Sequence, residues 1–105
     1  MSGSFDDRRK GFEGKWAHDA EARFKIVARR NKLLGLWAAS ELGKSGADAE
    51  AYAQEVVAAD FEEPGEEDVY RKVRRDLDAA KITEHTIRRK MAELLDTAAE
   101  QVAKE

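Results

Sequence analysis

The sequence predicts an all-α protein: a compact four-helix bundle over residues 16–105, with one long N-terminal helix, preceded by a flexible segment over residues 1–15. Composition is the first reason, because Ala, Glu, Lys, Arg and Leu dominate while Val, Ile and Thr are sparse. The second is the spacing of apolar residues by three and four positions in successive stretches. Glycine, proline and capping residues separate these stretches and mark the ends of helices.

The segment over residues 1–15 has no pattern that would build a core. Phe5 and Phe12 are its only large apolar residues, and acidic and basic residues alternate around them. Gly3, Gly11 and Gly14 each lower the helix propensity by about 1 kcal/mol relative to Ala. We therefore expect the segment to be mobile in the free protein. The two phenylalanines, seven positions apart, share one face if it becomes helical on a partner.

The longest helix is expected from about Ala17 to Leu42. Its predicted core stripe contains Trp16, Ala20, Phe24, Val27, Leu34 and Ala38, widened by Ile26, Leu33, Leu36 and Trp37. Gly43 is the expected helix stop and Ser45 the next N-cap. Two interpretations remain open for Trp16, which can cover the end of the bundle or anchor a partner.

Three shorter helices are expected to follow. The second runs from about Ala47 to Phe61 and ends before Pro64 and Gly65. The third begins at an acidic turn, which suits the positive end of a helix, and the fourth is capped by Thr83. Their predicted core faces are Ala49, Tyr52, Ala53, Val56 and Ala59; then Val69, Val73, Leu77 and Ala80; then Ile87, Met91, Leu94, Leu95, Ala98 and Val102.

The sequence lacks the residues that several kinds of chemistry require. The absence of cysteine excludes disulfides and thiolate chemistry, and no stretch reaches membrane-spanning length. Gly43-Lys44-Ser45 resembles the end of a phosphate-binding loop, but Ala38 stands where its first glycine is needed. Neither His18 nor His85 has a second ligand at helical spacing, so no metal site is expected. With no nucleophile and base arrangement either, we expect a protein that is not an enzyme.

Three basic clusters lie in predicted helices, at residues 29–32, 71–75 and 88–90. For the last two we favour a solvated face paired with acids four residues away. For Arg29, Arg30 and Lys32 two interpretations stay open: such a solvated face, or a phosphate site that binds ADP or ATP. The net charge of -3 argues against a general nucleic-acid binder.

The stretch from Phe5 to Gly43 resembles the ATPase inhibitor zeta subunit family of alphaproteobacterial F-type ATP synthase. The most specific blocks are FDDR, AHD and ARRNKLLGLWAA, and the later blocks YAQEVVAADFEEPGEEDVYRKV and IRRKM also fit. The resemblance covers nearly the whole chain. It implies a four-helix bundle with a flexible inhibitory N-terminus, no cofactor, and a monomer when free.

The resemblance also implies a function. The protein would inhibit ATP hydrolysis by inserting its N-terminal segment into a catalytic α/β interface of the soluble head, near the γ stalk. It would be cytoplasmic, associated with the membrane-bound synthase through that head, and would neither enter the membrane nor bind nucleic acid. The implied partner-binding residues are Phe5, Asp6, Asp7, Arg8, Phe12, Glu13, Lys15, Trp16 and His18. Gly11 and Gly14 depart from the family pattern, in which residues that favour helix stand at these positions.

Two other functions remain as alternatives. A helical regulatory protein that senses ADP or ATP is compatible with inhibition, and a small nucleic-acid-associated protein would use the arginine clusters. A nucleotide titration and a gel-shift assay at low salt separate them.

Overall fold

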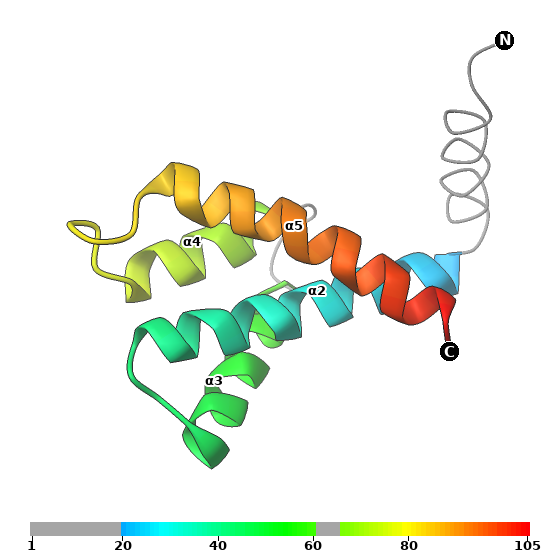
Figure 1. Ribbon diagram of the computed structural model, residues 1–105, viewed down its shortest axis with the longest axis horizontal. Helices are drawn as coiled ribbons and strands as arrows, with labels where there is room; N and C mark the ends of the chain where they lie inside the picture. Colours follow the sequence, from blue (N-terminus) through cyan, green and yellow to red (C-terminus); the bar gives the residue numbers. More distant parts are fainter. Residues whose placement is uncertain (1–19, 61–65) are drawn as a thin grey trace, which may run out of the picture.

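The computed structural model describes residues 20–60 and 66–105, which form four α-helices joined by short links (Figure 1). They are α2 (Ala20–Glu41), α3 (Gly46–Ala59), α4 (Glu67–Asp76) and α5 (Glu84–Ala103). These residues contain no strand, so the predicted all-α bundle is confirmed. Among the helices of these two ranges, α2 is the longest with 22 residues, although α5 almost equals it with 20. The predicted flexible segment, residues 1–15, lies outside the described residues.

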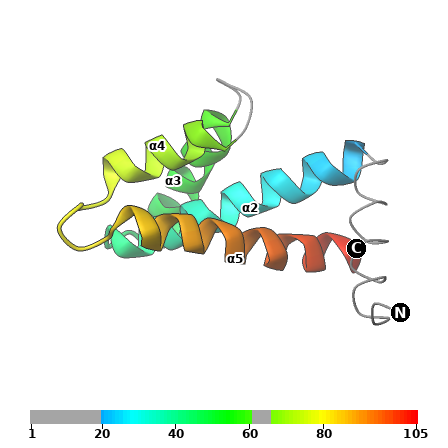
Figure 2. The same ribbon diagram turned by 90° about the horizontal axis from the view of Figure 1, so that it is seen from above.

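α2 is the central helix of the bundle, because it packs against α3, α4 and α5, whereas the backbones of α3 and α5 do not approach each other closely. α2 and α5 run antiparallel along much of their length (Figures 1 and 2). Arg29 near the start of α2 binds Gln101 near the end of α5. At the other end of the pair, Lys90 lies over the ring of Trp37. α3 instead crosses α2 (Figure 1).

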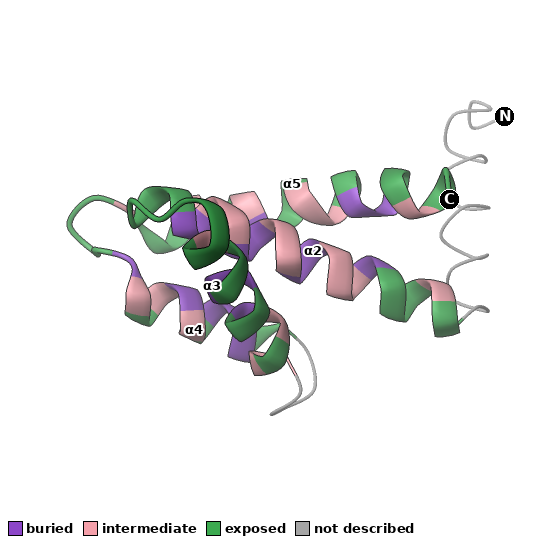
Figure 3. Ribbon diagram, turned by 90° about the horizontal axis from the view of Figure 1, so that it is seen from below, coloured by how far each residue is buried: buried purple, intermediate pink, exposed green. Residues whose placement is uncertain are grey.

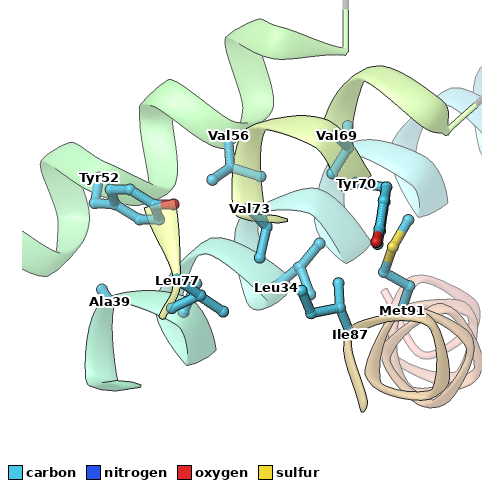
Figure 4. Close-up of a cluster of buried hydrophobic side chains, with 11 residues drawn as sticks. Leu34, Ala39, Tyr52, Val56, Val69, Tyr70, Val73, Leu77, Ile87 and Met91 are labelled. Atoms are coloured by element: carbon cyan, nitrogen blue, oxygen red, sulfur yellow. The ribbon is translucent and has the colours of Figure 1, made fainter. Parts of the chain in front are cut away.

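The main core lies where all four helices meet. Figure 4 shows its side chains converging from α2, α3, α4 and α5. Its buried members are Leu34, Ala38, Ala39, Tyr52, Val56, Val69, Tyr70, Val73, Leu77, Ile87 and Met91, with Trp37, Ala49, Ile82 and Leu94 packed against them. Most of the predicted core faces of the last three helices are thereby confirmed. Ala80 is not part of this core: α4 ends at Asp76, Leu77 is extended, and Ala80 is exposed.

A second, smaller cluster joins only α2 and α5. Ile26 packs against Ala98 and Ala99, and Leu33, Leu95 and Val102 border them. The bundle therefore tapers to a two-helix end, formed by the first half of α2 and the second half of α5 (Figure 1). Figure 2 shows that the two helices diverge toward the start of α2 and the end of α5. Figure 3 shows buried residues on both helices in this region. Small alanines on α5 allow this close packing, since they place little side chain between the helices.

The predicted core stripe of the first helix is wrong at its beginning. Ala20 and Phe24 are exposed, and the side chain that is buried there is Ile26. At the two-helix end α5 covers only one side of α2, so an apolar position on the opposite side stays outside. Further along, Leu34 and Ala38 are fully buried as predicted, because three helices surround them.

The helix boundaries follow the local chemistry of the chain. Gly43 has φ +79°, and the backbone N–H groups of Gly43 and Lys44 donate to the carbonyls of Ser40 and Ala39, which is a Schellman ending. Thr83 caps α5 as predicted, since its Oγ1 accepts from the backbone N–H of Thr86 at 3.2 Å. Ser45 occupies the N-cap position of α3, but its side chain makes no capping hydrogen bond.

Candidate functional site

The predicted partner-binding residues lie outside the described part of the chain. They are Phe5, Asp6, Asp7, Arg8, Phe12, Glu13, Lys15, Trp16 and His18. The structure describes where this segment joins the bundle, because α2 begins at Ala20. That point is the two-helix end, away from the links between α2 and α3 and between α4 and α5 (Figure 1).

The surface at the two-helix end combines charge with one large apolar side chain. Phe24 is 62% exposed, and Glu21, Arg23 and Lys25 are exposed around it. Behind this surface, the guanidinium of Arg29 donates to the carboxamide of Gln101 and to the carboxylate of Glu105. These contacts fasten the first half of α2 to the end of α5 and to Glu105, the residue that ends the chain. The predicted partner-binding segment therefore continues into a helix that is held in place.

The three residues of the candidate nucleotide site point to different parts of the bundle. Arg29 binds the end of α5, and Lys32 lies 3.9 Å from Glu50 on α3. Arg30 is only 3% exposed and donates from Nη1 to Glu66, at the start of α4, at 3.1 Å. The fold does not gather the three cations into one cluster, since each one already faces a carboxylate of another element. ADP or ATP binding at these residues remains a prediction.

Arg30 belongs instead to a buried polar cluster between α2, the end of α3 and the start of α4. Its Nε donates to Oδ1 of Asn31 at 2.7 Å, and Asn31 is 1% exposed. Asp68 in the first turn of α4 is 7% exposed and accepts from Arg71 at 2.8 Å. Sequence reasoning missed these residues as a group. Asn31 was hidden within a basic run, and Asp68 within an acidic turn that was interpreted only as favouring the positive end of a helix.

Asp60, directly after α3, has a carboxyl group whose pKa is shifted. Its pKa is raised above the ordinary value, chiefly because burial disfavours the charged carboxylate. The Asn31 amide and the Arg30 guanidinium lower this pKa, whereas the Asp68 carboxylate raises it further. These neighbours thus act on the pKa of Asp60 in opposite directions.

A second polar network connects α3 with α4 near the end of α4. The Tyr52 hydroxyl donates to Oδ2 of Asp76 at 2.9 Å. Nζ of Lys72 lies 2.8 Å from Glu55 and 2.9 Å from Asp76, and 5.0 Å from the centre of the Tyr52 ring. Burial and the hydrogen bond to Asp76 raise the pKa of Tyr52 strongly, so the hydroxyl stays protonated and remains a donor. This network holds two helices together.

Arg88, in the third basic cluster, also connects helices. Arg88 on α5 forms two hydrogen bonds with the Glu67 carboxylate on α4, at 2.7 and 3.1 Å. Its guanidinium lies 3.7 Å from the centre of the Tyr70 ring. The hydrogen bonds from Arg88 hold the pKa of Glu67 below its ordinary value. The cluster at residues 88–90 thus includes a structural contact between α4 and α5.

Two kinds of site can be checked across residues 20–60 and 66–105. Within these ranges, no group of three or more histidine, aspartate or glutamate side chains is arranged to hold a metal ion. None of the four described helices combines the length and apolar character needed to cross a membrane. His85 is exposed on α5, and His18 lies outside the described residues.

Comparison with known proteins identifies the family. One solved structure, a solution NMR structure, is 56% identical to this chain and superposes with a TM-score of 0.72. The match covers 78% of this chain and 95% of the other. No curated protein matches the chain. The family model described as "ATPase inhibitor subunit zeta" matches residues 1–101. The chain therefore belongs to the ATPase inhibitor subunit zeta family.

Proposed function

We propose that this protein inhibits ATP hydrolysis by F-type ATP synthase, as a regulatory subunit that works by binding rather than by catalysis. The observation that carries the proposal is the family match over residues 1–101, which includes the whole N-terminal segment. Binding requires no catalytic group, and the polar networks of the described helices are used to hold those helices together. Its place is the cytoplasmic side of the synthase, on the soluble head.

The finer part of the proposal is that the N-terminal segment enters a catalytic α/β interface and reaches the γ stalk. Phe5 and Phe12 are its apolar anchors, and the surrounding charges suit a polar rim. The segment is joined to a helix that Arg29 fastens to α5, so a force on the inserted segment is passed to the whole bundle. The bundle limits how far the segment can enter. Inhibition is then mechanical, because a wedge between rotating parts stops turnover.

The exposed start of α2 supports contact with the synthase at the two-helix end of the bundle. Phe24 is exposed at the two-helix end, only a few residues after Trp16 and His18. Large aromatic side chains are common anchors at protein interfaces. The contact with the synthase would therefore extend from the segment onto the first turns of α2.

The decisive experiment measures ATP hydrolysis by the cognate synthase head with the full-length protein and with a variant lacking residues 1–15. The full-length protein is expected to inhibit, and the truncated protein is expected to lose inhibition while its helical circular dichroism persists. Full inhibition by the truncated protein would refute the N-terminal mechanism. No inhibition by either form would refute the proposed function as a whole.

A further inference from the structure

The end of α5 is joined to α2 by a forked contact. The guanidinium of Arg29 donates from Nη1 to Oε1 of Gln101 at 3.0 Å and from Nη2 to the carboxylate of Glu105. The two acceptors are four positions apart, so they lie on one face of a helical turn. The backbone N–H of Glu105 donates to the carbonyl of Val102, which continues this turn beyond the end of α5. The end of α5 therefore offers two acceptors to one planar donor group, at the helix end where a cation is favoured.

Apolar packing between α2 and α5 is sparse at this end of the bundle. The buried residues are Ile26 on α2 and Ala98 and Ala99 on α5. Figure 2 shows that the two helices diverge beyond this point, and most side chains over residues 20–25 are exposed. Arg29 follows Ile26 by three positions and lies on the same face of α2. Its forked contact thus gives the first half of α2 a second point of attachment to α5.

The first turns of α2 form a lever between this attachment and the N-terminal segment. Ala20 and Arg29 are nine positions apart, which corresponds to about 13 Å of helix. Glu21 and Lys25 form an ion pair within this stretch, which supports the helix but does not attach it to a neighbour. A change in the direction of α2 at Arg29 therefore moves the point from which the N-terminal segment continues.

We propose that Gln101 and Glu105 are positioning residues for inhibition: through Arg29, they fix the direction in which α2 presents the N-terminal segment to the synthase. This role rests on the proposed function. A segment that continues from a fixed helix loses less conformational freedom on binding than one that continues from a swinging helix end. The last turn of α5, distant in the sequence from the inhibitory segment, thereby contributes to inhibition.

The forked contact can be removed without unfolding the bundle. The side chains of Arg29 and Glu105 are 33% and 47% exposed, and exposed ion pairs contribute little to the free energy of unfolding. The main core packs on the second half of α2 and includes neither residue. Loss of the contact is therefore expected to weaken inhibition while the melting temperature stays nearly the same.

The first test compares the full-length variant Gln101→Ala with Glu105→Ala against wild type, in titrations of ATP hydrolysis by the synthase head. The concentration for half-inhibition is expected to rise by about threefold to tenfold, because the end of α2 must be ordered on binding. The residual activity at saturation is expected to match wild type, since the N-terminal segment is unchanged. Glu100→Ala removes one negative charge from an exposed position of the same helix end and is the matched control, expected to inhibit like wild type.

The second test reverses the ion pair and measures hydrogen exchange. Arg29→Glu is expected to weaken inhibition, and adding Glu105→Arg is expected to restore part of it, because the pair forms again with opposite polarity. In the variant Gln101→Ala with Glu105→Ala, the amides of residues 23–28 are expected to exchange faster, while those of residues 34–38 stay protected.

The outcomes separate the positioning role from the proposed function. If the variant Gln101→Ala with Glu105→Ala inhibits at the wild-type concentration, or Glu100→Ala loses as much inhibition, the positioning role is overturned and the proposed function stands. If the reversed pair inhibits no better than Arg29→Glu alone, the positioning role is also overturned. If wild type itself does not inhibit, both the proposed function and the positioning role are refuted.

Discussion

The α carbon of Ala53 on α3 lies 2.6 Å from the position that a Cβ atom on Gly35 of α2 would occupy. The two helices therefore meet almost backbone to backbone where α3 crosses α2. Only glycine leaves room for this approach, and the Cβ atoms of Ala53 and Val56 close the space around it, at 3.1 and 3.2 Å. This crossing sets the distance between α2 and α3 at the centre of the main core.

Gly35→Ala is expected to destabilise the protein by about 1–3 kcal/mol, the usual cost of overpacking a core. The added methyl group meets a backbone atom, so α3 must move rather than a side chain. Urea unfolding followed by circular dichroism measures the change. Ala53→Gly is not expected to rescue the variant, because the α carbon remains.

Gly43→Ala is the control for the destabilisation expected of Gly35→Ala. A Cβ on Gly43 meets nothing within 4 Å, and the cost there comes from φ +79°, which disfavours residues with a side chain by roughly 1–2 kcal/mol. If Gly35→Ala were as stable as wild type, the close approach of α2 and α3 would be refuted.

Asp76→Asn is expected to reduce stability by about 1–2 kcal/mol near pH 7. Burial acts to raise the pKa of Asp76, but the hydrogen bonds from Lys72 and Tyr52 outweigh it, and the net pKa is lowered. A lowered carboxyl pKa contributes stability above the ordinary aspartate range, and this contribution is lost as the pH falls through the folded-state pKa. The difference between wild type and Asp76→Asn is therefore expected to shrink as the pH falls from about 5 towards 2. A difference that grew on acidification would contradict this assignment.

The double variant Phe5→Ala, Phe12→Ala is expected to weaken inhibition of ATP hydrolysis by tenfold or more, since one aromatic anchor at an interface is commonly worth about 2 kcal/mol. Both residues precede the described bundle, so the melting temperature is expected to change little. Inhibition titrations with the synthase head measure the effect. Ser2→Ala with Ser4→Ala is the control in the same segment, and equal losses from both pairs would argue against specific anchors.

Gly11→Ala with Gly14→Ala is expected to strengthen inhibition. Each substitution raises helix propensity by about 1 kcal/mol, which lowers the cost of folding the segment on its partner. Together they correspond to a gain of roughly tenfold or more in affinity. Weaker inhibition would instead mean that the bound segment needs glycine at these positions for close contact or for a turn.

ADP or ATP binding at Arg29, Arg30 and Lys32 is tested by NMR titration with each nucleotide. If the nucleotide displaces the present carboxylate partners, amide shifts are expected around these residues and also at Glu50 and Glu105. The charge-removing variant Arg29→Gln is expected to weaken such binding. An absence of shifts near Arg29, Arg30 and Lys32 would exclude the site.

The helices and their ends were predictable from local sequence. The Schellman ending at Gly43 and the cap at Thr83 depend on residues within one turn, so composition and spacing were sufficient for them. The extent of α4 was overestimated because Ala80 continues the apolar spacing, although the chain becomes extended at Leu77. The partner-binding residues of the N-terminal segment were proposed from resemblance and stay a prediction, since they lie outside the described residues.

Local chemistry was thus enough to predict an all-α chain and the breaks between its helices. It was also enough to predict the apolar faces at positions that several helices surround. The tertiary structure alone decided which side of α2 is covered at the two-helix end, which leaves Phe24 outside and Ile26 inside. It also decided that Arg30 and Asn31 on α2 and Asp68 on α4 are buried, with Arg30 bound to Glu66 at the start of α4. Burial and charge coupling of this kind arise from residues distant in the sequence, and spacing along one helix carries no information about them.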